Sequence, residues 1–158
     1  MYPCLEIKGD ITQYKLNAVE KAKGWQEIDN KWYYFDEQGN MLKDTWLKDN
    51  DNWYYFDDNG VMIKDEWKMY NNDWFYINDD GKMLNSIWLK FGDSWYFLDE
   101  TGKMVKQKWI KYENEWFYLN KMGIMAVDTY IINKGKYYYV NDRGALENIV
   151  KRTKSSKK

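Results

Sequence analysis

Residues 45–65 read TWLKDNDNWYYFDDNGVMIKD, and this pattern returns every 21 residues along most of the chain. Its first tryptophan recurs at a constant spacing, and a tyrosine ends the series: Trp25, Trp46, Trp67, Trp88, Trp109 and Tyr130. A second series follows seven residues later: Trp32, Trp53, Trp74, Trp95, Trp116 and Tyr137. No insertion or deletion breaks the register over residues 24–146. The sequence therefore predicts six structural units that stack with a constant step.

Three further positions of the pattern keep their character from one repeat to the next. One is always aromatic: Tyr34, Tyr55, Tyr76, Phe97, Tyr118 and Tyr139. One is always glycine: Gly39, Gly60, Gly81, Gly102, Gly123 and Gly144. The third is a methionine that gives way to leucine at the end: Met41, Met62, Met83, Met104, Met125 and Leu146.

Each repeat is typical of a short β-hairpin, with two aromatic-rich runs on either side of a polar stretch. We expect a two-residue loop at Asp49 and Asn50, which would place Trp46 directly opposite Trp53. After each hairpin an Asp or Asn precedes the glycine by three residues, which predicts a type I turn capped by the Asx side chain. An isolated hairpin is marginal in water, so the hairpins must stack. The predicted fold is all-β, a solenoid of six stacked β-hairpins.

The repeats divide the chain into three parts. Residues 1–23 form a leader or linker, in which Asp10, Gln13 and a helix-forming run to Ala22 indicate a short helix. Residues 24–148 form the solenoid. Residues 149–158 form a basic tail, whose charged residues are Lys151, Arg152, Lys154, Lys157 and Lys158.

The composition argues against an enzyme and against several kinds of partner. Aromatic residues make up 20% of the chain, histidine is absent and Cys4 is the only cysteine. The commonest metal ligand and general base is thus missing, so we expect no catalytic residues, no metal and no cofactor. Acids such as Asp36 and Asp57 recur in turns without a paired carboxylate, which gives glycosidase chemistry little support. Outside the basic tail the chain is net acidic, which argues against nucleic acid.

No stretch approaches the roughly 18 to 20 apolar residues of a membrane span. The N-terminus also lacks the charged and apolar regions of a signal peptide. We therefore expect either a chain that leaves the cell without a standard signal, as phage lysins do, or a fragment of a larger protein.

Two tryptophans per hairpin, with an aromatic ring and a thioether from the next hairpin, would form a box of π faces. A quaternary ammonium group suits such a box, because it is large, weakly hydrated and unable to donate a hydrogen bond. The alternative is that the rings are core. Some of them must be. Each residue of the second series begins a run of three aromatic residues, the aromatic triplet. We expect the middle rings of these triplets to lie on the structural side: Tyr33, Tyr54, Phe75, Tyr96, Phe117 and Tyr138.

The pattern Gly24-Trp25, then the run from Trp32 to Asp36, then Gly39-Asn40-Met41 resembles the choline-binding repeats of Gram-positive surface proteins, autolysins and phage endolysins. The resemblance covers residues 24–146. It implies that choline or phosphocholine of cell-wall teichoic or lipoteichoic acid is the partner, and that the protein is extracellular and associated with the cell wall. It also implies that the module targets a lytic enzyme or a surface protein to the wall.

In that family each site takes two tryptophans from one repeat and a tyrosine and a methionine from the next. The resemblance implies a first site of Trp25, Trp32, Tyr55 and Met62, and a second of Trp46, Trp53, Tyr76 and Met83. It implies a third of Trp67, Trp74, Phe97 and Met104, and a fourth of Trp88, Trp95, Tyr118 and Met125. A fifth would use Trp109, Trp116, Tyr139 and Leu146.

Two departures from the family pattern affect the expected sites. Phe97 keeps the ring of the usual tyrosine, whereas Leu146 replaces methionine and should weaken the fifth site. Tyr130 and Tyr137 have no following repeat to close a sixth box, so the last repeat is expected to be a cap or a homodimer surface.

Three other readings remain open. The nearest is a carbohydrate-binding array similar to clostridial toxin and glucan-binding repeats, which usually lack the second tryptophan. A purely structural spacer and an enzyme are the others.

Overall fold

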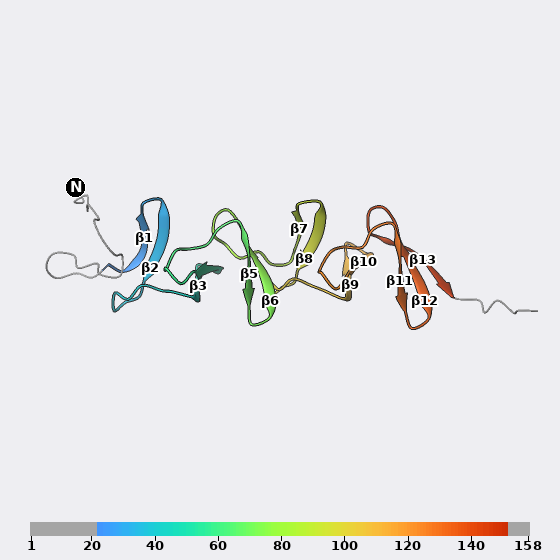
Figure 1. The fold of residues 1–158 in the computed structure, drawn as a ribbon, viewed down its shortest axis with the longest axis horizontal. Helices are drawn as coiled ribbons and strands as arrows, with labels where there is room; N and C mark the ends of the chain where they lie inside the picture. The colour runs from blue at the N-terminus through green and yellow to red at the C-terminus, as the bar shows by residue number, and fades with distance from the viewer. Residues whose placement is uncertain (1–21, 152–158) are drawn as a thin grey trace, which may run out of the picture. The chain divides into compact units, whose positions relative to one another are not determined.

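The computed structural model describes residues 22–151, and all of the regular structure in this range is β-strand (Figure 1). The strands are β1 (Gly24–Ile28), β2 (Lys31–Phe35), β3 (Thr45–Asp49), β4 (Asn52–Phe56), β5 (Glu66–Tyr70), β6 (Asp73–Ile77), β7 (Ile87–Phe91), β8 (Ser94–Leu98), β9 (Lys108–Tyr112), β10 (Glu115–Leu119), β11 (Thr129–Asn133), β12 (Lys136–Val140) and β13 (Leu146–Lys151). Consecutive strands pair as antiparallel hairpins, which confirms the predicted all-β fold. The expected N-terminal helix, up to residue 21, and residues 152–158 of the tail lie outside the described residues.

The chain divides into two compact units. The described part of the first unit is residues 22–66 and 77–83, and that of the second is residues 67–76 and 84–151. Within residues 22–151 no helix is long and apolar enough to cross a bilayer.

The hairpin turns begin one residue later than expected. In the second hairpin Asp49 pairs with Asn52, so the two-residue loop is Asn50 and Asp51. Both loop residues have positive φ, 45° and 64°. Asn and Asp adopt this conformation more readily than other residues with a side chain, and it belongs to the type I′ turn that matches strand twist.

This later turn changes which side chains face each other. Trp46 lies opposite Tyr55, and Trp53 lies opposite Lys48. The prediction that the two tryptophans are directly opposite is therefore wrong. They still share one face of the hairpin as diagonal neighbours, because Trp53 is two residues from Tyr55.

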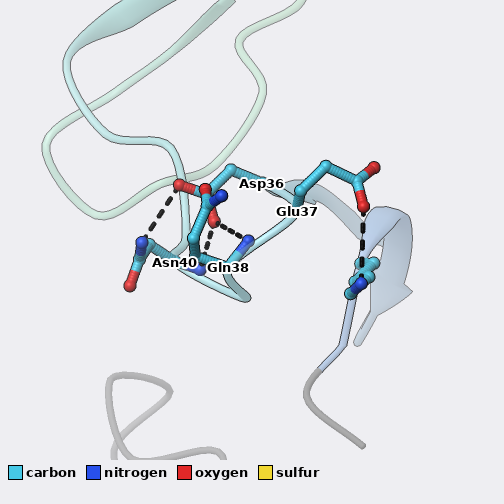
Figure 2. Close-up of polar contacts among 5 residues, drawn as sticks. Asp36, Glu37, Gln38 and Asn40 are labelled. Atoms are coloured by element: carbon cyan, nitrogen blue, oxygen red, sulfur yellow. Dashed lines mark hydrogen bonds and ion pairs between the residues drawn. The ribbon is translucent and has the colours of Figure 1, made fainter.

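The turn that follows each hairpin is confirmed as predicted. After the first hairpin, the Gly39 N–H donates to the Asp36 carbonyl at 2.9 Å, and Gly39 has a φ of 75°. Figure 2 shows the Asp36 carboxylate, whose Oδ1 accepts hydrogen bonds from the backbone N–H groups of Gln38 and Asn40 at 2.9 and 2.8 Å. The side chain thus ties the turn that each repeat uses to reverse direction.

Backbone hydrogen bonds set the step from one repeat to the next. In the first unit, the Met62 N–H donates to the Trp32 carbonyl of the preceding hairpin at 2.8 Å. The next residue, Ile63, donates to the Tyr55 carbonyl of its own hairpin at 3.0 Å. The segment after each hairpin is therefore held between two hairpins. The same bond to the preceding hairpin joins Met83 to Trp53, Met104 to Trp74 and Met125 to Trp95.

The core follows one position of the repeat, the residue after the aromatic triplet. It is apolar in every repeat and almost inaccessible to solvent: Phe35, Phe56, Ile77, Leu98, Leu119 and Val140. In four of the repeats, the methionine packs against the glycine of the next repeat, as Met62 does in the first unit. A Cβ on Gly81 would lie 2.5 Å from its Cε atom. Glycine is needed there for its φ of 81° and for this close approach.

The last hairpin gains a third strand, which the repeat pattern did not predict. β13 pairs with β12 in an antiparallel arrangement that is irregular at Tyr139 and Val140. It begins at Leu146, where earlier repeats have methionine, and it crosses the boundary expected at residue 148. The sheet of the last repeat is thus β11, β12 and β13.

Candidate functional site

One face of each of the first five hairpins carries the paired tryptophans. In the first hairpin the ring centroids of Trp25 and Trp32 lie 6.2 Å apart with their planes at 78°. Three of the second tryptophans are unusually open to solvent for so large an apolar side chain: Trp53 and Trp95 are 40% exposed and Trp116 is 44% exposed. Aromatic surface of this kind, repeated along the chain, is typical of a binding face.

In four places within the two units, the middle ring of one hairpin's triplet packs against the first tryptophan of the preceding hairpin. In the first unit, Trp25 and Tyr54 have ring centroids 4.9 Å apart. In the second unit the same contact joins Trp67 to Tyr96 at 5.2 Å, Trp88 to Phe117 at 5.2 Å and Trp109 to Tyr138 at 5.5 Å. The middle rings lie on the opposite strand face from the tryptophans of their own hairpin. That face also forms a wall beside the tryptophan of the preceding hairpin.

The third aromatic of each triplet lies against the first tryptophan of its own hairpin. Tyr55 stacks edge-on with Trp46 at 5.1 Å and is 1% exposed. Its hydroxyl donates a hydrogen bond to Asp44. In the second unit the corresponding distances are 5.3 Å for Trp67 and Tyr76, 5.2 Å for Trp88 and Phe97, and 5.2 Å for Trp109 and Tyr118.

Backbone hydrogen bonds connect the methionines to the paired tryptophans. Met62, Met104 and Met125 each donate their N–H to the carbonyl of a second tryptophan, as described above. Of the second expected site, Trp46, Trp53 and Met83 belong to the first unit and Tyr76 to the second.

A hollow of about 330 Å³ lies at the fifth expected site. Its lining is largely apolar and comes from the five strands β9 to β13 of the second unit: Trp109, Trp116, Asn133, Tyr138, Leu146 and Ile149. Three of these residues were expected from the sequence, namely Trp109, Trp116 and Leu146. Tyr138 lines the hollow, whereas the sequence pointed to its neighbour Tyr139. Ile149 comes from β13, which the repeat pattern could not reveal.

Another residue that the repeat pattern did not predict lies beside Trp25. The Trp25 Nε1–H donates to the Asp49 carboxylate of the next hairpin at 3.0 Å. No other repeat has an acidic residue at the equivalent position, which holds Ile28, Tyr70, Phe91, Tyr112 or Asn133. Because no one residue type fills this position, the repeat pattern did not single it out.

Two ionisable side chains of the second unit have raised pKa values. The Tyr139 hydroxyl donates to Asp128 at 2.6 Å, and this hydrogen bond raises the pKa of Tyr139 to about 12. In the second unit, Lys103 pairs with Asp73 at 2.7 Å, which raises the pKa of that lysine. Residues 22–151 contain no group of three His, Cys, Asp or Glu side chains placed to hold a metal ion.

Comparison with known proteins finds repeats of the same kind. A model of the choline-binding repeat matches residues 22–67 and 45–88, and a model of the cell wall binding repeat matches residues 87–104 and 107–125. A search of curated protein sequences found no match.

Three solved structures illustrate the similarity. Choline binding protein F from Streptococcus pneumoniae is 38% identical, with a TM-score of 0.66 over 80% of this chain and 42% of that one. CbpJ from the same organism is 28% identical, with a TM-score of 0.68 over 85% and 47%. The pneumococcal cell wall endolysin of phage Cp-1, solved in complex with choline, is 30% identical, with a TM-score of 0.56 over 91% and 40%.

The chain thus spans less than half the length of each of these proteins. The two repeat models together match more than half of its residues, in the register that its hairpins follow. The chain therefore belongs to the choline-binding repeat family of cell-wall-binding proteins.

Proposed function

We propose that the chain is a non-catalytic module that binds the choline groups of teichoic or lipoteichoic acid in a bacterial cell wall. The observation that carries this proposal is the hollow lined by Trp109, Trp116 and Tyr138. Its ring faces are partly open to solvent, and aliphatic side chains complete the lining. A trimethylammonium group gains from the ring quadrupoles there and leaves no hydrogen bond unsatisfied.

The other expected sites are proposed on the same plan. Two tryptophans come from one hairpin. The methionine of the next repeat is held beside them by the hydrogen bond from its backbone N–H to the carbonyl of the second tryptophan. For the ring supplied by the next hairpin, we favour the middle one of the triplet. Tyr54 contacts Trp25, whereas Tyr55 is buried against Trp46 and presents almost no free surface.

A single site of this kind would be weak. Cation–π contacts contribute about 0.5 to 2 kcal/mol per ring, so about 4 kcal/mol per site corresponds to a Kd near the millimolar range. Several sites facing a polymer that repeats the same headgroup would raise the avidity by about 10² to 10⁴. Repetition therefore suits a wall polymer better than a free metabolite.

For the whole protein, we propose a role in holding a lytic enzyme, such as an endolysin or autolysin, or a surface protein at the cell wall. The module would act outside the cell. The similarity to choline binding protein F and to the phage endolysin supports this placement.

We also propose that the last repeat can pair with a second copy of the chain. Tyr130 and Ile132 share one face of the terminal hairpin and are 57% and 66% exposed. Sedimentation of the chain at increasing concentration tests this pairing, and a monomer at all concentrations contradicts it.

Thermal unfolding followed by tryptophan fluorescence tests the proposed function. Choline at about 100 times its Kd should stabilise the protein by about 2.7 kcal/mol per site, and should quench the fluorescence of the cage tryptophans. Neutral oligosaccharides should do neither. A response to oligosaccharides with none to choline would favour a carbohydrate-binding array instead.

A further inference from the structure

One variable position lies beside the first tryptophan of the preceding hairpin. It is the last residue of the first strand of a hairpin, immediately before the turn. It follows that tryptophan by 24 residues. Four such pairs lie within one unit: Asp49 after Trp25, Phe91 after Trp67, Tyr112 after Trp88, and Asn133 after Trp109. We call these four residues the tuning position.

The contacts at the tuning position recur in both units. In the first unit, Asp49 accepts a hydrogen bond from the Trp25 indole at 3.0 Å. In the second unit, the ring of Phe91 lies 6.1 Å from that of Trp67, and the ring of Tyr112 lies 6.3 Å from that of Trp88. Asn133 lines the terminal hollow together with Trp109. The location is shared, but the chemistry differs: a carboxylate, two aromatic rings and a neutral amide.

We propose that the tuning position sets the ligand preference of these four sites, and that Asp49 makes the first site more selective for a positively charged ligand than the terminal hollow. This inference rests on the proposed choline-binding function. A carboxylate bonded to the indole N–H pushes electron density onto the ring of Trp25, which strengthens its attraction for a cation. The negative charge of Asp49 also attracts the cation directly. Asn133 supplies neither effect to the terminal hollow.

The charge dependence can be measured site by site in the full chain. The ligands are choline and its neutral tert-butyl analogue, and the readout is the NMR signal of each indole N–H. Trp25→Phe and Trp109→Phe variants assign the two signals. The preference for choline over the neutral analogue should be about 3- to 10-fold greater at Trp25 than at Trp109 in low salt. Added salt should reduce this difference.

Asp49→Asn is the main variant, because asparagine keeps the size of the side chain and an oxygen that can accept the indole hydrogen bond. Choline affinity at Trp25 should fall by about 3- to 10-fold, with little change for the neutral analogue. Asp51→Asn is the matched control. It removes the same charge two residues away, from a side chain that is 99% exposed, and should leave Trp25 unaffected.

The reverse variant tests the inference independently of how Asp49→Asn folds. Asn133→Asp should raise the choline affinity at Trp109 by a similar factor. Unchanged choline affinity at Trp25 in Asp49→Asn, or an equal loss in Asp51→Asn, would overturn the inference while other indole signals still respond to choline. If no indole signal responds to choline in the unaltered chain, the proposed function itself fails.

Discussion

At the scale of single residues, the second tryptophans and the core residues behave as opposites. Trp95 is 40% exposed, while Leu98, three residues along the same strand, is fully buried. The energy of folding comes mainly from the burial of apolar area, which Leu98 provides in full and Trp95 only in part. Trp95 is thus both the larger and the more exposed of the two side chains. Exposing so large an apolar side chain to water is unfavourable, which agrees with a binding role for Trp95.

Substitution should separate these two roles. Trp95→Leu should lower the free energy of unfolding by less than about 1.5 kcal/mol but remove one choline site from a calorimetric titration. Leu98→Ala should lower the free energy of unfolding by about 2 to 5 kcal/mol, because it leaves a cavity in the core. Urea unfolding and titration with choline check both variants. A large stability loss in Trp95→Leu would mark that indole as core.

Tyr139 provides a prediction about alkaline pH. Its folded-state pKa of about 12 lies above the ordinary value of 10.0 because its hydroxyl donates to Asp128. The folded state therefore holds this proton more tightly than the unfolded state. The stability from this bond is complete below pH 10 and is lost as the pH rises towards 12.

In Asp128→Asn, the pKa of Tyr139 should move back towards 10, and the loss of stability between pH 10 and 12 should become shallower. Ultraviolet absorbance of tyrosinate during a pH titration follows the first effect, and thermal unfolding follows the second. Tyr139→Phe should show the same shallower pH dependence. A titration of Asp128→Asn identical to that of the unaltered chain would contradict this explanation.

At the scale of elements, each repeat depends on two kinds of turn whose backbone conformation favours glycine or Asx residues. The hairpin loops use pairs such as Asp29 and Asn30, both with positive φ. The turns after the hairpins use a glycine with a φ near 80°, closed by an Asx carboxylate or amide. Only the turn glycine also has a methionine side chain against it, so the two kinds of turn should differ in their tolerance of a Cβ.

Gly81→Ala should therefore cost more than Gly135→Ala. Both positions have positive φ, which costs an alanine about 1 to 2 kcal/mol, but a Cβ at Gly135 meets nothing within 4 Å. At Gly81 the Cε of Met62 would lie 2.5 Å away, so the total cost should reach about 2 to 4 kcal/mol.

A double-mutant cycle separates the two contributions at Gly81. Combined with Met62→Ala, the change Gly81→Ala should cost only the backbone strain, which the free energy of unfolding in urea will show. Equal costs in the two backgrounds would mean that the methionine moves aside freely.

At the scale of the whole molecule, the proposed function depends on the number of binding sites. The second unit contains the first tryptophans of three expected sites, Trp67, Trp88 and Trp109. Each is expected to be weak, so a soluble ligand with a single choline cannot reveal what the repeats achieve together. A surface that displays many choline groups engages the sites simultaneously.

Trp88→Ala should accordingly have two unequal effects. In a titration with free choline, the protein should lose about one site, and the affinity of the others should stay the same. On a matrix that displays choline, its dissociation should accelerate by about tenfold or more, because one of the linked contacts is missing. Surface plasmon resonance compares the dissociation rates. Equal, small effects in both experiments would show that the sites act independently.

Much of the fold follows from local patterns in the sequence. The period of 21 residues identifies the equivalent positions, and the turn that joins Asp36 to Gly39 was predicted with its hydrogen bonds. These features depend on residues close together in the chain, so they can be predicted without knowing the tertiary contacts. The core position that contains Leu98 could also have been predicted, since it is apolar in every repeat. It was not identified, because the larger tryptophans form the more conspicuous pattern.

By itself, the sequence determined the all-β repeats, the turns after the hairpins and the series of paired tryptophans. Only the tertiary structure decided that Trp46 faces Tyr55, that Tyr54 lies against Trp25, and that β13 completes the last sheet. The period tells which residues are equivalent, whereas a contact between hairpins depends on the strand register and on how one hairpin packs against the next. The tuning position was not predicted for the same reason. Four different residue types occupy it, so what they share is their location beside a tryptophan, which only the tertiary structure shows.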